Sequence, residues 1–270
     1  MRRFWLRLKD KIGNSSFVNH ISFLWHWKNF FFLLRYPFYK VYNRWTGKFM
    51  GYSYTEYDSI DIGWRKAFGK QLSDEIKKAG EESRKRLGYR SWKNLLQWSQ
   101  IKEKYGELRM YASATSEIQK VLDKYELLSI GYCFNCGKPA RYMSKGWIEY
   151  YCEDCMIKYL KAGDKYRNTP ITDDEIQQEL SQLRLTKKDI PELISYEYPV
   201  LKVETFNSIE ERDERFNQLY ADREDESCYF RKVNLDADKQ YQIEHVKIIT
   251  HTSTSNAKYG FDFEELWGLK

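Results

Sequence analysis

Two stretches in the first half of the chain carry apolar residues at helical spacing. The first has large apolar side chains four positions apart and predicts a helix with one apolar face: Trp64, Phe68, Leu72 and Ile76. Gly80 is its expected end, with a polar, basic connector following at residues 81–89. The second stretch predicts a helix that begins at Thr115 or Ser116, as N-cap, and reaches Leu128.

Between these helices, polar and apolar residues alternate, which predicts a β-hairpin. The pattern gives a strand at residues 96–102, a turn at Tyr105 and Gly106, and a return strand at residues 107–112. The alternation places two sets of side chains on opposite faces of the return strand: Leu108, Met110 and Ala112, and Glu107, Arg109 and Tyr111. The Tyr-rich residues 52–57 are expected to form a strand or an extended loop.

The second half of the chain contains two capping boxes, at residues 172–175 and 208–211, and each predicts the start of a helix. Strands are expected at residues 198–204, 229–233 and 241–250. A linker at residues 161–170 is expected to separate this half from the first.

Four of the five cysteines form two pairs separated by fifteen residues: Cys133, Cys136, Cys152 and Cys155. This spacing is typical of a zinc site with four sulfur ligands, which is closed to water and therefore structural. A hairpin between the pairs, with a helix ending at Gly163 after them, predicts a zinc ribbon or treble clef. A disulfide framework fits poorly because no secretory leader is evident, and a reducing cytoplasm is the expected location. Cys228 is expected to be a buried strand residue.

The sequence thus predicts an α+β fold in three parts. Residues 1–50 form a basic, aromatic N-terminal arm. Residues 51–165 form a hairpin and helix block with the four-Cys zinc unit, and residues 171–270 form a smaller acidic α+β module.

Charge differs strongly between these parts. Residues 1–50 carry ten Lys/Arg and one Asp, residues 51–170 carry 22 basic and 16 acidic side chains, and residues 171–270 carry 13 basic and 22 acidic side chains. A polyanion would therefore be attracted to the first two-thirds of the chain.

The arm combines cations with aromatic residues, and three interpretations of it remain open. Lys28 and Arg35 interrupt its apolar run, so it is not expected to span a membrane. It could lie on a membrane surface or stack on single-stranded nucleic acid. It could also pack against the fold or a protein partner, which is the commonest role of aromatic side chains.

Lys102, Lys104 and Arg109 lie on the predicted hairpin, where they could form a basic ledge that binds the phosphates of nucleic acid. The alternative is a solvated hairpin face on which Glu103 and Glu107 are cross-strand partners.

The hairpin and the cysteines together resemble a group of small phage-encoded and bacterial proteins. That group shares a K-E-K-F/Y-G-x-L-R-F/Y-Y hairpin before a pair of zinc knuckles, and the resemblance covers about residues 60–160. This chain has Glu107 where a second Gly is common and Met110 where an aromatic residue is common. The resemblance implies a phage or prophage setting and a shared domain, and it carries over no catalytic residue.

Common catalytic motifs are absent: the chain has no phosphate-binding G-x-x-x-x-G-K-[ST] loop, no G-x-G-x-x-G and no G-x-S-x-G. The best enzyme candidate is a degenerate His-Asn-His-like nuclease at Glu244 and His245. Asn256 follows, but no His comes after it, and His251 is the other nearby candidate.

The leading expectation is a non-enzymatic protein with structural Zn²⁺ that binds nucleic acid or a nucleic-acid-handling protein. A protein-interaction factor that binds a host protein is the alternative, and the degenerate nuclease is the second alternative.

Overall fold

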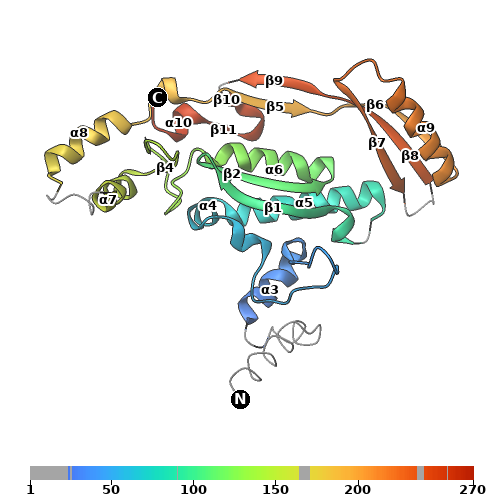
Figure 1. Cartoon of the computed structure of the whole chain (residues 1–270), viewed down its shortest axis with the longest axis horizontal. Helices are drawn as coiled ribbons and strands as arrows, with labels where there is room; N and C mark the ends of the chain where they lie inside the picture. The colour runs from blue at the N-terminus through green and yellow to red at the C-terminus, as the bar shows by residue number, and fades with distance from the viewer. Residues whose placement is uncertain (1–23, 25, 90, 164–170, 236–239, 254) are drawn as a thin grey trace.

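The computed structural model describes residues 24, 26–89, 91–163, 171–235, 240–253 and 255–270. It mixes helices and strands, as the predicted α+β class requires. Figure 1 shows an elongated molecule with the cysteine-bearing elements at one end, a small sheet at the other and a helix and hairpin block between them. No helix within the described ranges is long and apolar enough to cross a membrane.

The central block contains the predicted hairpin and helices: α4 (Ile62–Ala67), α5 (Gly69–Leu87), β1 (Leu96–Lys104), β2 (Glu107–Ala114) and α6 (Ser116–Ser129). The hairpin prediction is confirmed, because β1 and β2 pair antiparallel and Tyr105 and Gly106 form the turn with φ angles of 56° and 79°. Leu108 and Met110 are buried in the core and Tyr111 is exposed, which agrees with the predicted alternation along the return strand.

The prediction that the first helix ends at Gly80 is wrong, because α5 continues through Gly80 to Leu87. A Cβ atom at Gly80 would lie 2.2 Å from the ring of Trp92, so this glycine makes room for an aromatic ring. The helix ends instead at Gly88, whose φ of 70° is left-handed. The expected connector at residues 81–89 is therefore mostly helix.

One side of the described part of the arm packs into the central core. It contains α3 (Trp27–Arg35) and the 3-10 helix η2 (Pro37–Tyr39). Leu33, Phe38 and Tyr39 are buried in one cluster with Trp64 of α4. The ring of Tyr39 stacks on that of Trp98, with centroids 5.8 Å apart. Packing against the fold is thus the role of these residues, while residues 1–23 and 25 of the arm lie outside the described residues.

Of the two expectations for residues 52–57, the strand is wrong: residues 52–55 form a loop, and residues 56–57 begin the 3-10 helix η3 (Glu56–Ser59). The side chain of Asp58 accepts a 2.8 Å hydrogen bond from the backbone nitrogen of Thr55, which favours this tight turn over an extended chain.

Helix α6 covers the open edge of the hairpin. The backbone nitrogen of Leu108 donates a 2.9 Å hydrogen bond to the hydroxyl of Ser129, and that of Met110 donates to the carboxylate of Glu126. These bonds satisfy backbone groups of β2 that a neighbouring strand would otherwise pair with.

The cysteine-bearing unit contains β3 (Tyr142–Met143), β4 (Tyr150–Tyr151) and α7 (Glu153–Gly163). Helix α8 (Asp173–Leu183) begins at the predicted capping box and buries Ile176, Leu180 and Leu183 against this unit. Packing therefore crosses the predicted domain boundary. Residues 164–170 of the predicted linker lie outside the described residues.

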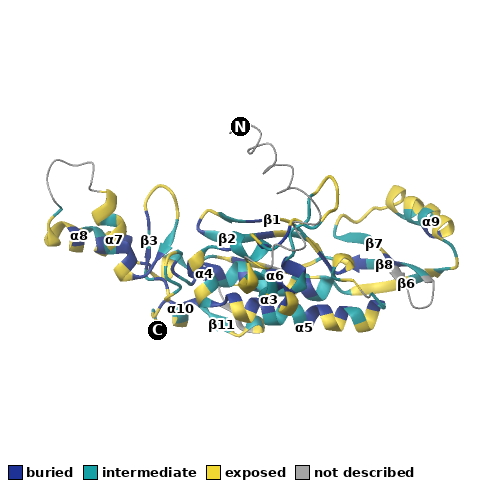
Figure 2. Ribbon diagram, turned by 90° about the horizontal axis from the view of Figure 1, so that it is seen from below, coloured by how far each residue is buried: buried dark blue, intermediate teal, exposed yellow. Residues whose placement is uncertain are grey.

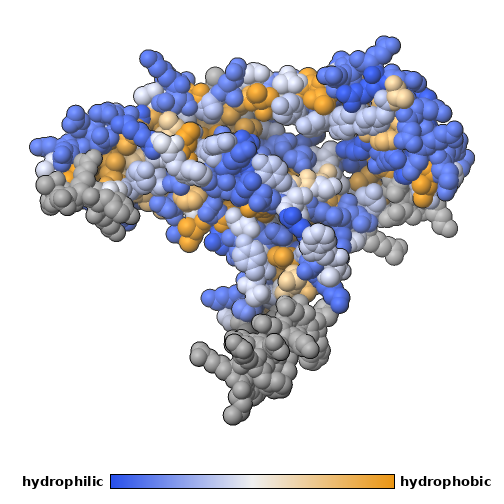
Figure 3. All heavy atoms as spheres, viewed as in Figure 1, coloured by the Kyte–Doolittle hydropathy of each residue, from blue (hydrophilic) through white to orange (hydrophobic). Residues whose placement is uncertain are grey.

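The remaining elements form a ribbon and a small sheet. Strands β5 (Leu193–Glu197) and β9 (Ile249–Ser253) pair antiparallel. Strands β6 (Val200–Phe206), β8 (Gln240–Lys247) and β7 (Cys228–Leu235) form a sheet in that order, and α9 (Ile209–Ala221) packs against it. Helix α9 is mostly exposed and hydrophilic (Figures 2 and 3). The short α10 (Phe263–Leu266) and Trp267 return to the middle of the chain and pack with Ile130 and Ala140.

Candidate metal centre

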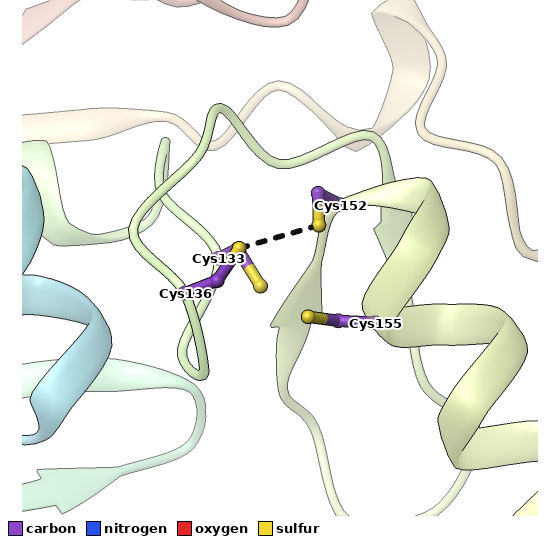
Figure 4. Close-up of side chains that lie close together, drawn as sticks. All are labelled: Cys133, Cys136, Cys152 and Cys155. Carbon is purple, nitrogen blue, oxygen red and sulfur yellow. Dashed lines mark hydrogen bonds between the residues drawn. The ribbon is translucent and has the colours of Figure 1, made fainter.

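The four cysteines predicted to bind a metal lie together (Figure 4). Their sulfur atoms are all within 4.8 Å of one another. The Sγ atoms of Cys136 and Cys152 are 3.4 Å apart, which is too far for a disulfide bond of about 2.05 Å. Tetrahedral zinc with Zn–S bonds of about 2.3 Å needs sulfurs separated by about 3.8 Å. The residues are therefore close enough to hold a metal ion and are compatible with zinc.

The first knuckle is the turn from Cys133 to Cys136, which follows α6. The backbone nitrogen of Cys133 donates a 2.7 Å hydrogen bond to the carbonyl oxygen of Lys138, and that of Gly137 donates a 2.9 Å bond to the carbonyl oxygen of Cys133. Gly137 has a φ of 79°, which glycine adopts without steric cost.

Helix α4 lies directly against the first knuckle, and two glycines permit the contact. A Cβ atom at Gly63 would lie 2.1 Å from the carbonyl oxygen of Phe134, and one at Gly137 would lie 2.5 Å from that of Gly63. The rings of Phe134 and Trp64 meet edge to face with centroids 5.6 Å apart. Sequence reasoning missed Gly63, because no local pattern marks a close contact with a residue seventy positions away.

The second knuckle, from Cys152 to Cys155, lies at the start of α7. This helix begins at Glu153, so the prediction that it starts after Cys155 placed it one turn too late. The backbone nitrogen of Met156 donates a 2.9 Å hydrogen bond to the carbonyl oxygen of Cys152. The partial positive charge of a helix N-terminus favours ionised thiolates at these two positions.

Burial works against ionisation of these thiols when no cation is near. It raises the pKa of Cys152 to about 11 and also raises that of Cys155. Partial burial opposes ionisation of Cys136 as well, but hydrogen bonds from the backbone of Lys138 and from neighbouring thiols outweigh it and lower its pKa. A divalent cation is the natural partner for such a cluster, because it stabilises all four thiolates at once.

The site is largely enclosed. Cys133, Cys152 and Cys155 are buried, and Cys136 is partly exposed. At the surface, the ammonium of Lys138 lies 2.7 Å from the carboxylate of Asp154 and so links the two knuckles. Four sulfur donors complete a tetrahedral coordination shell and leave no position for a water ligand or a substrate.

The three residues of the predicted basic ledge have different surroundings. Lys102 and Arg109 are cross-strand partners on the hairpin. Arg109 is neutralised, because its guanidinium pairs with Glu107 and lies 3.6 Å from the carboxylate of Glu126. Arg109 therefore fits the solvated-face alternative, with Glu107 as its ion-pair partner. Glu103 has a different role, because its carboxylate accepts a hydrogen bond from the backbone nitrogen of Gly106 in the turn.

The two lysines of the ledge lie on aromatic rings. The ammonium of Lys102 is 5.4 Å from the ring centroid of Tyr111, and that of Lys104 is 5.3 Å from the ring centroid of Tyr105. Neither lysine forms an ion pair with a carboxylate in the part of the chain that the structure describes. Their charge is therefore available to an anion.

Arg44 and Trp45 extend this face and were missed by sequence reasoning, which placed them in the arm. The guanidinium of Arg44 donates to the carbonyl oxygen of Ser99, at a bulge in β1. The side chain of Asn43 accepts a 3.0 Å hydrogen bond from the backbone nitrogen of Trp45 and so forms a tight turn. Trp45 is 96% exposed at the tip of this turn. Arg44 of this turn lines a surface hollow together with Ser99, Gln100, Lys102 and Tyr111.

Within the described part of the chain, His245 and His251 do not come together at a metal site. His245 lies on β8, where its Nε2 atom is 2.8 Å from the carboxylate of Glu204, and His251 lies on β9 in the separate ribbon. Among the described residues, the four cysteines form the cluster of possible metal ligands, and neither histidine belongs to this cluster. The side chain of Asn256 is outside the described set.

Cys228 differs from its expected buried position, because it is only partly buried. It begins β7, and its sulfur lies 3.4 Å from the carboxylate of Asp225.

No protein-family model, no curated protein and no solved structure matches this chain.

Proposed function

We propose that this chain is a non-enzymatic zinc protein that binds nucleic acid through the outer face of its hairpin. The observation that carries the proposal is the pair Lys102 and Lys104, whose charges have no carboxylate partner among the described residues and lie on exposed aromatic rings. We call the proposed site the hairpin surface and define it by Arg44, Trp45, Lys102, Lys104 and Tyr111.

Zinc has a structural role in this proposal. Four thiolates fill its coordination shell, which leaves no open position for catalysis. The first knuckle contacts α4 through Gly63 and Phe134, and α4 belongs to the core that supports the hairpin. Bound zinc therefore stabilises the block that carries the hairpin surface. Four reduced thiolates fit a reducing compartment such as the cytoplasm.

The hairpin surface has the two chemical features that non-specific nucleic-acid binding needs. Arg44, Lys102 and Lys104 supply positive charge for phosphates. Trp45 and Tyr111 offer exposed ring faces on which bases can stack. Residues 24–50 add to the positive charge of this region, because they contain five Lys/Arg and no Asp or Glu. Arg109 is not included, since its charge is already neutralised.

The resemblance of residues 60–160 to phage-encoded proteins supports a phage or prophage setting for this activity. In that setting, the partner would be single-stranded or duplex nucleic acid, or a protein that handles it.

Binding of labelled single-stranded DNA and RNA to the full-length chain at increasing salt tests the proposal. Lys102→Gln with Lys104→Gln should weaken binding at low salt. It should also reduce the slope of log affinity against log salt by about 1.4, since each phosphate contact contributes about 0.7. A matched control is Lys187→Gln with Lys188→Gln, which removes the same charge from the exposed 3-10 helix η6 (Lys187–Asp189). Equal slopes in both variants, or affinity that does not fall with salt, would contradict the proposal.

A further inference from the structure

Helix α3 is apolar on two opposite sides. Its inner side contributes Leu33 to the central core. Its outer side presents Trp27, Phe31 and Leu34 to solvent, and Leu24, which precedes the helix in the chain, is also exposed. We call these four residues the α3 outer stripe. Each of the four is 58–63% exposed.

Within the helix, the spacing of four and three positions between Trp27, Phe31 and Leu34 places these residues on one side. The rings of Trp27 and Phe31 meet edge to face, with centroids 6.5 Å apart, so these two residues form one apolar surface. A helix with apolar side chains on two opposite sides normally has both of these sides covered. A contiguous exposed apolar row of this kind therefore indicates a binding surface.

Cations border the stripe. The ammonium of Lys28 lies 5.7 Å from the ring centroid of Trp27, and Arg35 follows Leu34 directly. Arg35 remains 57% exposed although its guanidinium is 3.3 Å from the carboxylate of Asp74. There is no acidic residue in α3 itself.

We infer that the α3 outer stripe docks on an anionic lipid surface, with the helix axis in the plane of the membrane. Large apolar residues bordered by Lys and Arg are the composition of helices that lie at such interfaces. The helix has nine residues, which is too short to span a bilayer and long enough to lie on one. This inference does not depend on nucleic-acid binding by the hairpin surface.

Charge and side-chain chemistry favour lipid over other occupants. A second copy of α3 would bring a second Lys28 against the first, and like charges oppose that contact. Nucleic acid would gain little from Leu24 and Leu34, because aliphatic side chains offer no ring face for a base. An anionic bilayer provides both an apolar layer for the stripe and negative headgroups for the cations.

Co-sedimentation of the full-length chain with vesicles tests this inference. The vesicles are made of phosphatidylcholine alone or of phosphatidylcholine mixed with phosphatidylglycerol. We expect binding to the mixed vesicles, with an affinity at least about tenfold lower in a Phe31→Ser, Leu34→Ser variant, because two apolar side chains no longer enter the interface. Lys28→Gln should weaken binding to the mixed vesicles only. Trp147→Ser is the matched control, because Trp147 is 70% exposed in a loop of the cysteine-bearing unit.

Several outcomes would overturn the inference. Absence of binding to mixed vesicles would do so, and so would equal binding by the wild type and the stripe variant. Conversion of a dimer to a monomer by the stripe substitutions, measured by light scattering without vesicle binding, would identify a second copy as the occupant. A lower melting temperature of the variant with unchanged vesicle binding would show that the stripe is covered within the chain.

Discussion

The backbone nitrogen of Gly63 donates a 3.0 Å hydrogen bond to the carbonyl oxygen of Phe134, which lies between the first two cysteines. Gly63 is in the first turn of α4, and the next residue, Trp64, is fully buried in the central core. The proposed metal site and the main core therefore share one backbone contact. Loss of the metal should disturb the core, and disturbance of α4 should weaken the metal site.

Gly63→Ala should destabilise the protein. Its new Cβ atom would meet the carbonyl oxygen of Phe134 at 2.1 Å, and backbone atoms on both sides cannot move cheaply. Overpacking of this kind costs about 1–3 kcal/mol or more, although alanine is the better helix former. Thermal denaturation measures the effect. Gly163→Ala is the control, since no described residue from elsewhere in the chain lies within 4 Å of a Cβ atom there. Equal melting temperatures of the two variants would argue against a tight contact at α4.

Cys155→Ser should remove most of the bound zinc and lower the melting temperature sharply, because three thiolates hold zinc less tightly than four and its binding energy stabilises the fold. Elemental analysis of purified protein should give one zinc per chain for the wild type. Cys228→Ser should leave both the zinc content and the melting temperature close to the wild type, since Cys228 lies on β7 away from the cluster. A wild-type protein without zinc would remove the basis of the structural role.

Gly80→Ala should destabilise the protein by about 1–3 kcal/mol through its clash with the ring of Trp92. That ring has little room to move, because its centroid is 4.7 Å from that of the Phe38 ring and the guanidinium of Arg84 lies over it. In a Trp92→Ala background, the same change should be neutral or stabilising, since alanine favours the helix. Urea unfolding of the four proteins in this cycle measures the coupling. Additive effects would show that the two residues do not constrain each other.

Glu117→Gln should destabilise the protein at neutral pH and much less in acid. Burial opposes ionisation of Glu117, but hydrogen bonds from Arg86 and Ser83 outweigh it and lower its pKa to about 2. The pKa in the unfolded chain is about 4.3. The contribution of the ionised carboxylate is therefore complete above about pH 4.3 and is lost as the pH falls towards 2. Urea midpoints at pH 6 and pH 3 should show a smaller difference between the two proteins at pH 3. A constant difference would contradict the role of this ionisation.

Trp45→Ala should weaken nucleic-acid binding about tenfold without changing stability. Its ring is almost fully exposed, and stacking of a base on such a ring is worth about 1–3 kcal/mol. Fluorescence anisotropy with single-stranded DNA measures the affinity, and thermal denaturation checks the fold. Trp147→Ala is the matched control in an exposed loop outside the hairpin surface. Equal affinities of the two variants would exclude Trp45 from the binding surface.

Short-range signals in the sequence determined much of the fold. The hairpin turn at Tyr105 and Gly106, the apolar face of α6 and the capping box of α8 each depend on residues a few positions apart. The cysteines could be predicted for the same reason, because one short turn positions each pair and the spacing between the pairs matches a known ligand arrangement. Such signals can be recognised in the sequence because the interactions that produce them are local.

Only the tertiary structure decided which residues are free to act and where the chain closes on itself. The sequence cannot show that the ring of Trp92 occupies the space beside Gly80, nor that Glu126 of α6 helps to neutralise Arg109. It also cannot show that Arg44 reaches Ser99, more than fifty residues away. Each of these contacts joins segments that meet only after the core has formed, so no periodicity or spacing encodes them. The availability of Lys102 and the exposure of the α3 outer stripe are consequences of that packing.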